Sequence, residues 1–154
     1  MTLFRCTLKK WAGDLSGQGA FLYGGRWNTP GRYLIYAAEN NLLAALEVAL
    51  RIPLTKISKY YIMLSIHVPD AEEIFIPKLP KNWNRSYPIT QSIGDNFVDM
   101  NKTLLMKVPS ALMNHTHNYL INPTHRNFGK IKIGKPQPLV FDERLIKMMK
   151  LENE

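Results

Sequence analysis

The chain has 154 residues, 45% of them hydrophobic and 21% charged, a balance typical of one globular domain and not of a disordered chain. The chain has 20 Lys and Arg residues and 12 Asp and Glu residues. The resulting net charge of +8 favours an anionic partner such as a nucleotide, a nucleic acid or an acidic protein. Cys6 is the single cysteine, which excludes an internal disulfide and a multi-cysteine zinc site.

The sequence lacks the patterns that are typical of membrane contact and of nucleic-acid binding. No apolar run reaches the roughly 18–20 residues that a membrane helix needs, and the N-terminus shows no signal-peptide pattern. With a lone cysteine, this predicts a cytoplasmic protein that does not contact a membrane. No dense basic run with interleaved aromatics is present, and no zinc finger or RNA-binding signature. A small anion or a protein partner is therefore favoured over nucleic acid.

The predicted elements follow from periodicity and from local start and stop signals. A short apolar strand is expected at 33–36. A helix is predicted over 40–51, with Asn40 as its N-cap and Pro53 as its stop, and its apolar residues cover so much of its circumference that we expect burial on several sides. Alternation over 60–68 predicts a half-buried strand. Proline-containing loops separate the remaining candidates, which are short strands at 104–108, 119–121, 130–133 and 139–141 and a short terminal helix at 143–150.

These elements predict an α+β fold without the regular strand–helix alternation of a doubly wound sheet. We expect one compact domain over residues 1–154, with a mixed central β-sheet, flanking helices, a core at about 3–145 and a short C-terminal helix or tail. Gly17-Gln18-Gly19 lacks the third glycine of a dinucleotide fingerprint and precedes no clear helix, so that motif is not predicted.

The most informative segment is Gly24-Gly25-Arg26-Trp27-Asn28, which Pro30-Gly31 closes. Two adjacent glycines allow a sharp turn or a close approach of the backbone to a ligand. The planar fork of arginine can hold a phosphate through two hydrogen bonds, so an anion-binding role is favoured for Arg26. Tryptophan more often packs than stacks on a ligand, and packing is favoured for Trp27 and is the default for Tyr36.

Glu47 is the second informative residue, because it stands on an otherwise almost wholly apolar helix. At 100° per residue it lies on one line with Asn40 and Arg51. One interpretation is an ion pair with Arg51 on a narrow solvent-exposed strip, which would contribute only a few tenths of a kcal/mol. The other is a carboxylate that a rigid helix places at the floor of a pocket. The helix alone favours neither.

Other polar residues carry weaker signals. Ser110 follows Val108-Pro109 at an expected strand end, where a serine usually completes a turn, and no histidine–carboxylate pair supports a hydrolytic triad. Asn122-Pro123-Thr124-His125 is a turn by composition. His115 and His117 could bind a metal from one strand, but no nearby carboxylates or cysteines accompany them, so we predict no metal site.

Taken together, these segments resemble the RES domain family, which is named for its arginine, glutamate and serine. The resemblance runs from about Leu3 to Leu145. Any one landmark is weak, but their order and spacing are specific. The landmarks are Gly24-Gly25-Arg26-Trp27-Asn28 with Gly31, Tyr36-Ala37-Ala38-Glu39, Ala44-Ala45-Leu46-Glu47, Leu79-Pro80 with Trp83, Ile93-Gly94-Asp95, Val108-Pro109-Ser110, Asn122-Pro123 with His125, and Phe141-Asp142-Glu143-Arg144-Leu145.

The resemblance implies a toxin of a bacterial toxin–antitoxin pair that depletes NAD by hydrolysis or phosphorolysis. It implies a fold like that of ADP-ribosyltransferases, NAD as substrate with no further cofactor, and a helix-turn-helix antitoxin that covers the active-site cleft. Nucleic acid would be contacted only through the antitoxin, and a homo-oligomer stays open. Arg26, Glu47 and Ser110 would be the catalytic residues, and the substrate-binding residues would be Gly25, Trp27, Asn28, Tyr36, Asn122 and His125.

The chemistry fits these residue types. The nicotinamide of NAD is a cation that departs neutral, so no general acid is needed, and a carboxylate suffices to stabilise charge on the ribose. Glu47 is assigned that task, Arg26 would hold the diphosphate or an adjacent ribose, and Tyr36 would pack against the nicotinamide. Ser110 would hydrogen-bond the substrate or Glu47.

Three alternatives stay open. The same cleft could transfer ADP-ribose to a target protein, since the acceptor need not touch any residue identified above. The excess of Lys and Arg over Asp and Glu is the one feature that suggests a nucleic-acid-binding or RNA-cleaving protein. A non-catalytic interaction module would explain the charge but not the placement of Arg26 and Glu47.

Overall fold

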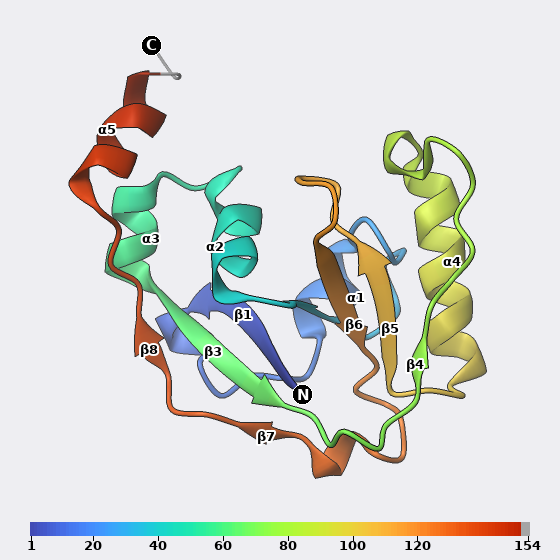
Figure 1. The fold of residues 1–154 in the computed structure, drawn as a ribbon. Coiled ribbons are helices and arrows are strands. Elements are labelled where there is room, and N and C mark those ends of the chain that lie inside the picture. Colours follow the sequence, from blue (N-terminus) through green and yellow to red (C-terminus); the bar gives the residue numbers. More distant parts are fainter. Residues whose placement is uncertain (152–154) are drawn as a thin grey trace.

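The computed structural model describes residues 1–151, and its centre is one mixed β-sheet (Figure 1). The strands run in the order β4-β5-β6-β2-β1-β3-β7, and β8 also pairs with β3. Within residues 1–151, β4 and β5 are the only strands that pair in parallel, and the other pairs are antiparallel. The strands are β1 Thr2–Leu8, β2 Ile35–Ala38, β3 Tyr61–His67, β4 Ile74–Phe75, β5 Leu105–Pro109, β6 His117–Ile121, β7 Lys132–Ile133 and β8 Gln137–Pro138.

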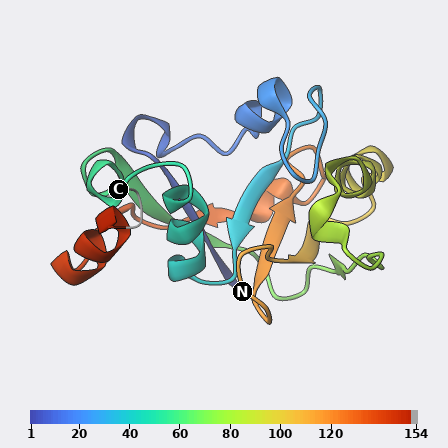
Figure 2. The same ribbon diagram turned by 90° about the horizontal axis from the view of Figure 1, so that it is seen from above.

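Helices flank this sheet, and α2 and α4 stand on either side of the central strands β2 and β6 in both ribbon views (Figures 1 and 2). This confirms the predicted α+β fold with a mixed sheet and flanking helices. The α-helices are α1 Gln18–Tyr23, α2 Asn41–Ala49, α3 Leu54–Tyr60, α4 Tyr87–Met100 and α5 Glu143–Leu151, and short 3₁₀ turns are η1 Lys9–Trp11, η2 Trp83–Arg85 and η3 Phe128–Lys130. None of the helices within residues 1–151 is long and apolar enough to cross a membrane.

The central strands are held in register by long pairings. β6 lies between β2 and β5, with Asn118 opposite Ala38 on one side and Val108 on the other. β1 pairs with β3 along its whole length but meets β2 at one position, Phe4 opposite Ala38. The short β1–β2 contact leaves the two strands free to diverge, and the cavity described below lies in this part of the molecule.

Several sequence predictions are confirmed. The helix predicted over 40–51 is α2, and the Asn40 side chain accepts the Leu43 N–H at 2.8 Å as its N-cap. The strand expected at 60–68 is β3, and the expected terminal helix is α5. The strands expected at 33–36, 104–108, 119–121 and 130–133 correspond to β2, β5, β6 and β7, each shifted by one or two residues at its ends.

Other predictions hold only in part or were wrong. Leu43, Ala44 and Ala45 follow one another at 100° around α2 and are all buried, so the helix is covered on more than one side, but Leu42 and Leu50 are 59% and 67% exposed. No strand forms at 139–141, because the pairing with β3 occurs earlier, at β8. A helix does begin within Gly17-Gln18-Gly19, since α1 starts at Gln18.

The largest element that the sequence prediction missed is α4. Pro88 is one of the prolines expected to lie in loops, but it lies in the first turn of α4. A backbone N–H at that position has no partner within the helix, so proline is tolerated there. Gly94 also weakens a helix by propensity, yet the neighbouring chain requires it: a Cβ there would lie 1.7 Å from the Trp27 carbonyl oxygen. Helix α4 therefore packs directly on the backbone of the segment that carries Arg26.

The close approach at Gly94 generates a stability prediction. Gly94→Ala should lower the free energy of unfolding by at least about 1–3 kcal/mol, because the overlap falls on backbone that cannot rotate away and outweighs the better helix propensity of alanine. Urea unfolding measures it. Gly129→Ala is the control, since a Cβ there has no heavy atom within 4 Å, and should change stability by under about 0.5 kcal/mol. Equal stabilities for the two variants would contradict the prediction.

Candidate active site

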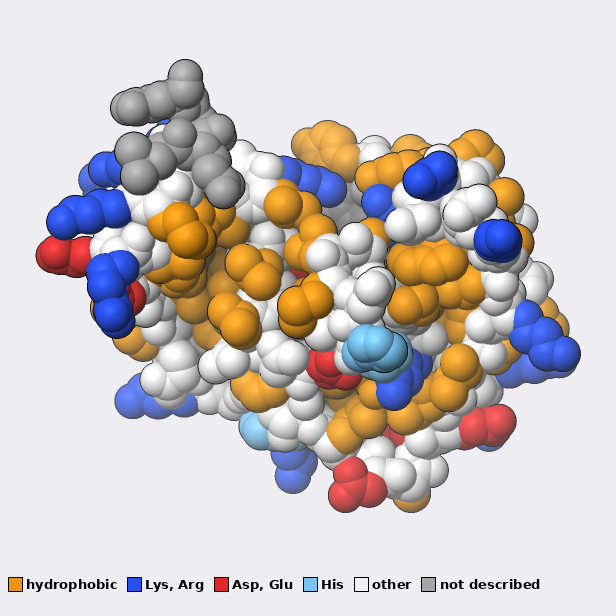
Figure 3. All heavy atoms as spheres, turned by 45° about the horizontal axis from the view of Figure 1, so that its top comes forward, with side chains coloured by type: hydrophobic (Ala, Val, Ile, Leu, Met, Phe, Trp, Pro, Cys, Tyr) orange, Lys and Arg blue, Asp and Glu red, His pale blue; other side chains and the backbone are white. Residues whose placement is uncertain are grey.

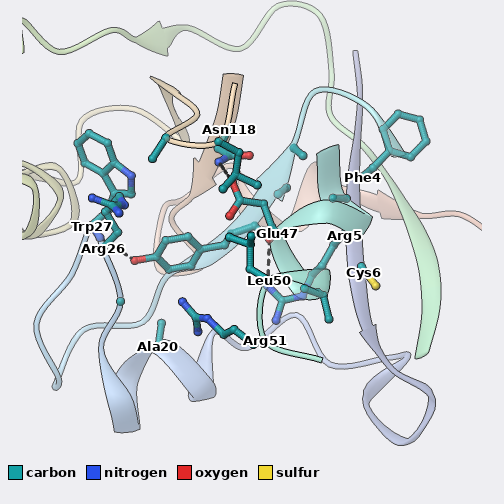
Figure 4. Close-up of a pocket in the computed structure, with 18 of the residues that line it drawn as sticks. Phe4, Arg5, Cys6, Ala20, Arg26, Trp27, Glu47, Leu50, Arg51 and Asn118 are labelled. Carbon is teal, nitrogen blue, oxygen red and sulfur yellow. Dashed lines mark hydrogen bonds between the residues drawn. The ribbon is translucent and has the colours of Figure 1, made fainter. Parts of the chain in front are cut away.

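A cavity of about 470 Å³ opens between the 24–28 turn, β1, β2, α2 and the hairpin that joins β5 to β6. This volume lies in the ordinary range for small-molecule sites. The lining combines apolar groups with a few polar ones, and Figure 4 shows them around α2 and the turn. The polar side chains of the lining include Arg5, Arg26, Tyr36, Glu47, Arg51, Tyr87 and Asn118.

Arg26 and Glu47 line this same cavity. Arg26 enters from the turn and Glu47 from α2 (Figure 4). Within the described residues no ion pair joins Glu47 to Arg51, so the solvent-strip interpretation of Glu47 does not apply. The pocket-floor interpretation describes its position.

The Glu47 carboxylate is held through one oxygen. Its Oε1 accepts a hydrogen bond from Asn118 Nδ2 at 2.6 Å and a longer one from Ser110 Oγ at 3.3 Å. Ser110 is buried, and its hydroxyl oxygen also accepts the Leu112 N–H at 3.1 Å. Oε2 has no hydrogen-bond partner among residues 1–150. The hydrogen bonds to Oε1 therefore orient the carboxylate and leave Oε2 available for a ligand.

Tyr36 fastens the turn to the sheet. Its hydroxyl donates to Asn28 Oδ1 at 2.7 Å and accepts the Trp27 N–H at 3.0 Å. Burial raises the pKa of Tyr36 above its usual range, so the hydroxyl keeps the proton that it donates. A Cβ on Gly25 would lie 2.6 Å from this hydroxyl oxygen, which explains why glycine stands there.

Trp27 and Asn28 build the turn. Trp27 is 2% exposed and packs against Trp83 with ring centroids 5.6 Å apart, and the residue also belongs to the cavity lining. Asn28 is fully buried, and its Nδ2 donates to the carbonyl of Ala20 at 2.9 Å. Their predicted contact with substrate stays a prediction.

Asn122 and His125 are not among the residues that line the cavity. Both are buried in the turn after β6, where Asn122 Oδ1 accepts the Thr124 N–H at 3.0 Å and His125 Nδ1 accepts the Asn127 N–H at 3.2 Å. These bonds stabilise the turn. The structure thus brings Gly25, Arg26, Trp27, Tyr36 and Glu47 to the cavity with Ser110 just behind it, and leaves Asn28, Asn122 and His125 apart from its lining.

The histidines do not converge on a metal site. His115 is exposed in a left-handed turn, and His117 Nδ1 lies 3.2 Å from Glu39 Oε2. No group of three or more His, Cys, Asp or Glu within residues 1–151 could hold a metal ion.

Among the charged and polar side chains of the lining, the sequence did not predict Arg5, Arg51, Tyr87 and Asn118. Arg5 Nη1 donates to the Tyr36 carbonyl at 3.1 Å, and its buried Nε has no partner among the described residues. Burial lowers the pKa of Arg5, and the negative charge of Asp14 opposes this effect. The strand β1 was not predicted. The presence of an arginine within the apolar stretch at 2–8 is therefore the only sequence signal that could have pointed to Arg5 as a site residue.

The cavity is cationic apart from Glu47. Figure 4 shows Arg5, Arg26 and Arg51 arranged around Glu47. Cys6 also lines the cavity, but burial raises the pKa of its thiol to about 11, so it is a thiol and a poor nucleophile at neutral pH. The arrangement can bind a polyanion and place one carboxylate beside it.

Comparison with known proteins identifies the family. The RES domain matches residues 2–142. The chain is 34% identical over 156 residues to Toxin Res of Photorhabdus laumondii, covering 97% of this chain and 100% of that protein. It is 34% identical over 143 residues to the Prs ADP-ribosylating toxin of a Sphingobium species, covering 88% of this chain and 89% of that protein.

Among solved structures, a chain of the M. tuberculosis MbcT–MbcA toxin–antitoxin complex matches with a TM-score of 0.71 and 20% identity, covering 96% of this chain and 87% of that chain. At that identity the match shows a shared fold. With the match over residues 2–142, the chain belongs to the RES domain family.

The two hydrogen bonds of the Tyr36 hydroxyl should contribute measurably to the stability of the protein. Tyr36→Phe should lower the free energy of unfolding by about 1–3 kcal/mol, because Trp27 N–H and Asn28 Oδ1 both lose a buried partner. Chemical denaturation of the purified variants measures it. Tyr119→Phe is the control: Tyr119 is buried too, but its hydroxyl makes no hydrogen bond to the described residues. A loss no greater for Tyr36→Phe than for Tyr119→Phe would sink the assigned role.

Proposed function

We propose that this protein is the toxin of a toxin–antitoxin pair and that it consumes NAD by cleaving the nicotinamide–ribose bond. The observation that carries the proposal is the shared cavity of Arg26 and Glu47, in which one carboxylate oxygen is clamped and the other is free. Relatives that carry the name Toxin Res support the biological role. The reaction would take place in the cytoplasm, on free NAD.

The cavity suits this chemistry for electrostatic reasons. The glycosidic bond of NAD breaks with loss of a neutral nicotinamide, which leaves positive charge on the ribose. The Glu47 carboxylate, already oriented by Asn118, would stabilise that charge without having to reorganise. Arg26 would hold the diphosphate, and Arg5 and Arg51 would add to the positive potential that attracts it.

The acceptor of the ADP-ribosyl group distinguishes two candidate activities. Water or phosphate would give hydrolysis or phosphorolysis. Transfer to a protein is the second candidate, and the relative named Prs ADP-ribosylating toxin favours it. In both, Glu47 and Arg26 would play the same parts.

We also propose an antitoxin of the helix-turn-helix type that covers the cavity. The fold is shared with a chain from a toxin–antitoxin complex. Apolar side chains cover much of the face in Figure 3, with Lys and Arg around them. Such a surface suits a protein partner with apolar anchors and acidic groups.

The decisive experiment incubates purified protein with NAD, with and without phosphate and with a candidate acceptor protein, and resolves the products. Release of nicotinamide supports the proposal. Free ADP-ribose, a phosphorylated ADP-ribose or a modified protein then identifies the acceptor. Intact NAD together with RNA cleavage or salt-sensitive nucleic-acid binding would instead favour the alternative based on the basic charge.

Glu47→Gln should lower kcat for NAD consumption by about 100- to 1000-fold while the protein stays folded, because an amide cannot supply negative charge to the transition state. Nicotinamide release measures it, and circular dichroism checks the fold. Glu39→Gln is the matched control, since Glu39 is half-buried but pairs with His117 outside the cavity lining. A Glu47→Gln enzyme as fast as wild type would refute this role.

Arg26→Ala should chiefly weaken NAD binding, by about 10- to 100-fold, since hydrogen bonds to a charged group contribute about 1.5–3 kcal/mol. Calorimetric titration of NAD into a Glu47→Gln background, which prevents turnover, gives the affinity directly. Arg126→Ala, a change at an exposed arginine away from the cavity lining, is the control. An unchanged dissociation constant for Arg26→Ala would argue against the assignment.

A further inference from the structure

The segment 84–95 makes a second set of contacts, which hold the Arg26 end of the cavity. Thr90 Oγ1 donates to the Arg26 carbonyl at 2.6 Å, and Gln91 Nε2 donates to the Gly25 carbonyl at 2.9 Å. Asp95 Oδ1 accepts the Thr29 N–H at 2.9 Å. Together with the close packing at Gly94, these bonds attach the backbone of the turn to α4.

The Arg26 side chain is held by the same segment. Its Nη1 donates to the Asn84 carbonyl at 3.0 Å, and its guanidinium carbon lies 4.6 Å from the centroid of the Tyr87 ring. One guanidinium nitrogen is thus occupied, and the guanidinium carbon lies over the Tyr87 ring. The remaining N–H groups of Arg26 have no partner among the described residues, so they stay available to a ligand.

The groups that hold Arg26 are neutral, and this separates it from Arg32 and Arg144, which pair with carboxylates. Arg32 Nη2 lies 2.7 Å from Asp99 Oδ2, and Arg144 Nε lies 2.9 Å from Asp142 Oδ1. A carboxylate partner cancels the charge of an arginine and competes with an incoming phosphate. An aromatic ring orients the cation by its quadrupole and leaves the charge in place.

We propose that Tyr87 is a positioning residue of the substrate site: its ring holds the guanidinium plane of Arg26 in the orientation that binds the anionic part of the substrate, and so sets affinity and not the rate of bond cleavage. Tyr87 begins α4, lines the cavity and is 47% exposed. The inference rests on the proposed use of NAD and adds a residue to that site. Preorganisation of this kind strengthens binding because the side chain need not be ordered by the ligand.

The test compares three substitutions at Tyr87 in steady-state NAD consumption. Tyr87→Ala should raise KM about 3- to 30-fold with kcat unchanged, a range that corresponds to the loss of one cation–π contact. Tyr87→Phe keeps the ring and should stay within about twofold of wild type. Tyr87→Leu keeps apolar volume without a π face, should behave like Tyr87→Ala, and serves if the alanine variant does not fold.

Tyr60→Ala is the matched control. Tyr60 is also 47% exposed and also carries a cation, Lys59 Nζ at 5.1 Å from its ring, but it does not line the cavity. Its KM should equal that of wild type. If Tyr87 acts through Arg26, Tyr87→Ala should produce no further weakening of NAD binding in an Arg26→Ala background.

Each contrary outcome is distinct. An active wild type whose KM is unchanged by Tyr87→Ala, or whose kcat falls instead, overturns the inference alone. Equal weakening by Tyr87→Phe and Tyr87→Ala would assign the effect to the hydroxyl and overturn it as well. Weakening that persists in the Arg26→Ala background would mean that the ring does not act through Arg26. A wild type that leaves NAD intact overturns the proposed function and this inference together.

Discussion

The Tyr36 hydroxyl connects the two parts of the chain that form the cavity. It accepts the Trp27 N–H and donates to the Asn28 side chain, so the turn that presents Arg26 is attached to the strand that leads into α2. The contact also demands that Gly25 lack a side chain. This link acts together with the packing of Trp27 in the core, where it belongs to the same cluster as Met106, Val108 and Leu120 of β5 and β6.

Helix α4 holds the same turn from the other side. Its backbone approaches so closely that Gly94 admits no Cβ, and its first turn carries the aromatic ring beneath Arg26. The turn is therefore held between a strand and a helix that are far apart in sequence. Rigid support on both sides suits a side chain that must meet a ligand in one orientation.

The electrostatics of the cavity follow one pattern. Arg5 and Arg26, which line it, are held by carbonyl groups and, for Arg26, by a ring, while Arg32 and Arg144, elsewhere, pair with carboxylates. The single carboxylate of the cavity, Glu47, is oriented by neutral amide and hydroxyl donors. Positive charge for an anion and one negative charge for a developing cation thus coexist without neutralising one another.

Much of this could be predicted from local patterns. Asn40 and Pro53 delimit α2 because a cap and a stop act on neighbouring residues. The alternation of β3 reports the face that buries Ile62, Leu64 and Ile66, although Met63 on the other face is buried too. Helix α4 was missed for the opposite reason. Gly94 is unfavourable for a helix, and the group that requires it belongs to Trp27, which no local pattern connects to it.

The sequence by itself determined the fold class, several of the elements (α2, α5, β2, β3, β5, β6 and β7) and, through the order of its landmarks, the RES domain family. Only the tertiary structure decided that Arg26 and Glu47 share a cavity, that Arg5, Tyr87 and Asn118 join them, and that Asn122 and His125 stabilise a turn outside its lining. The reason is physical: side chains from β1, the turn, α2, α4 and β6 meet because of strand register and helix packing. Those contacts link distant residues, and hydrophobic periodicity does not record them.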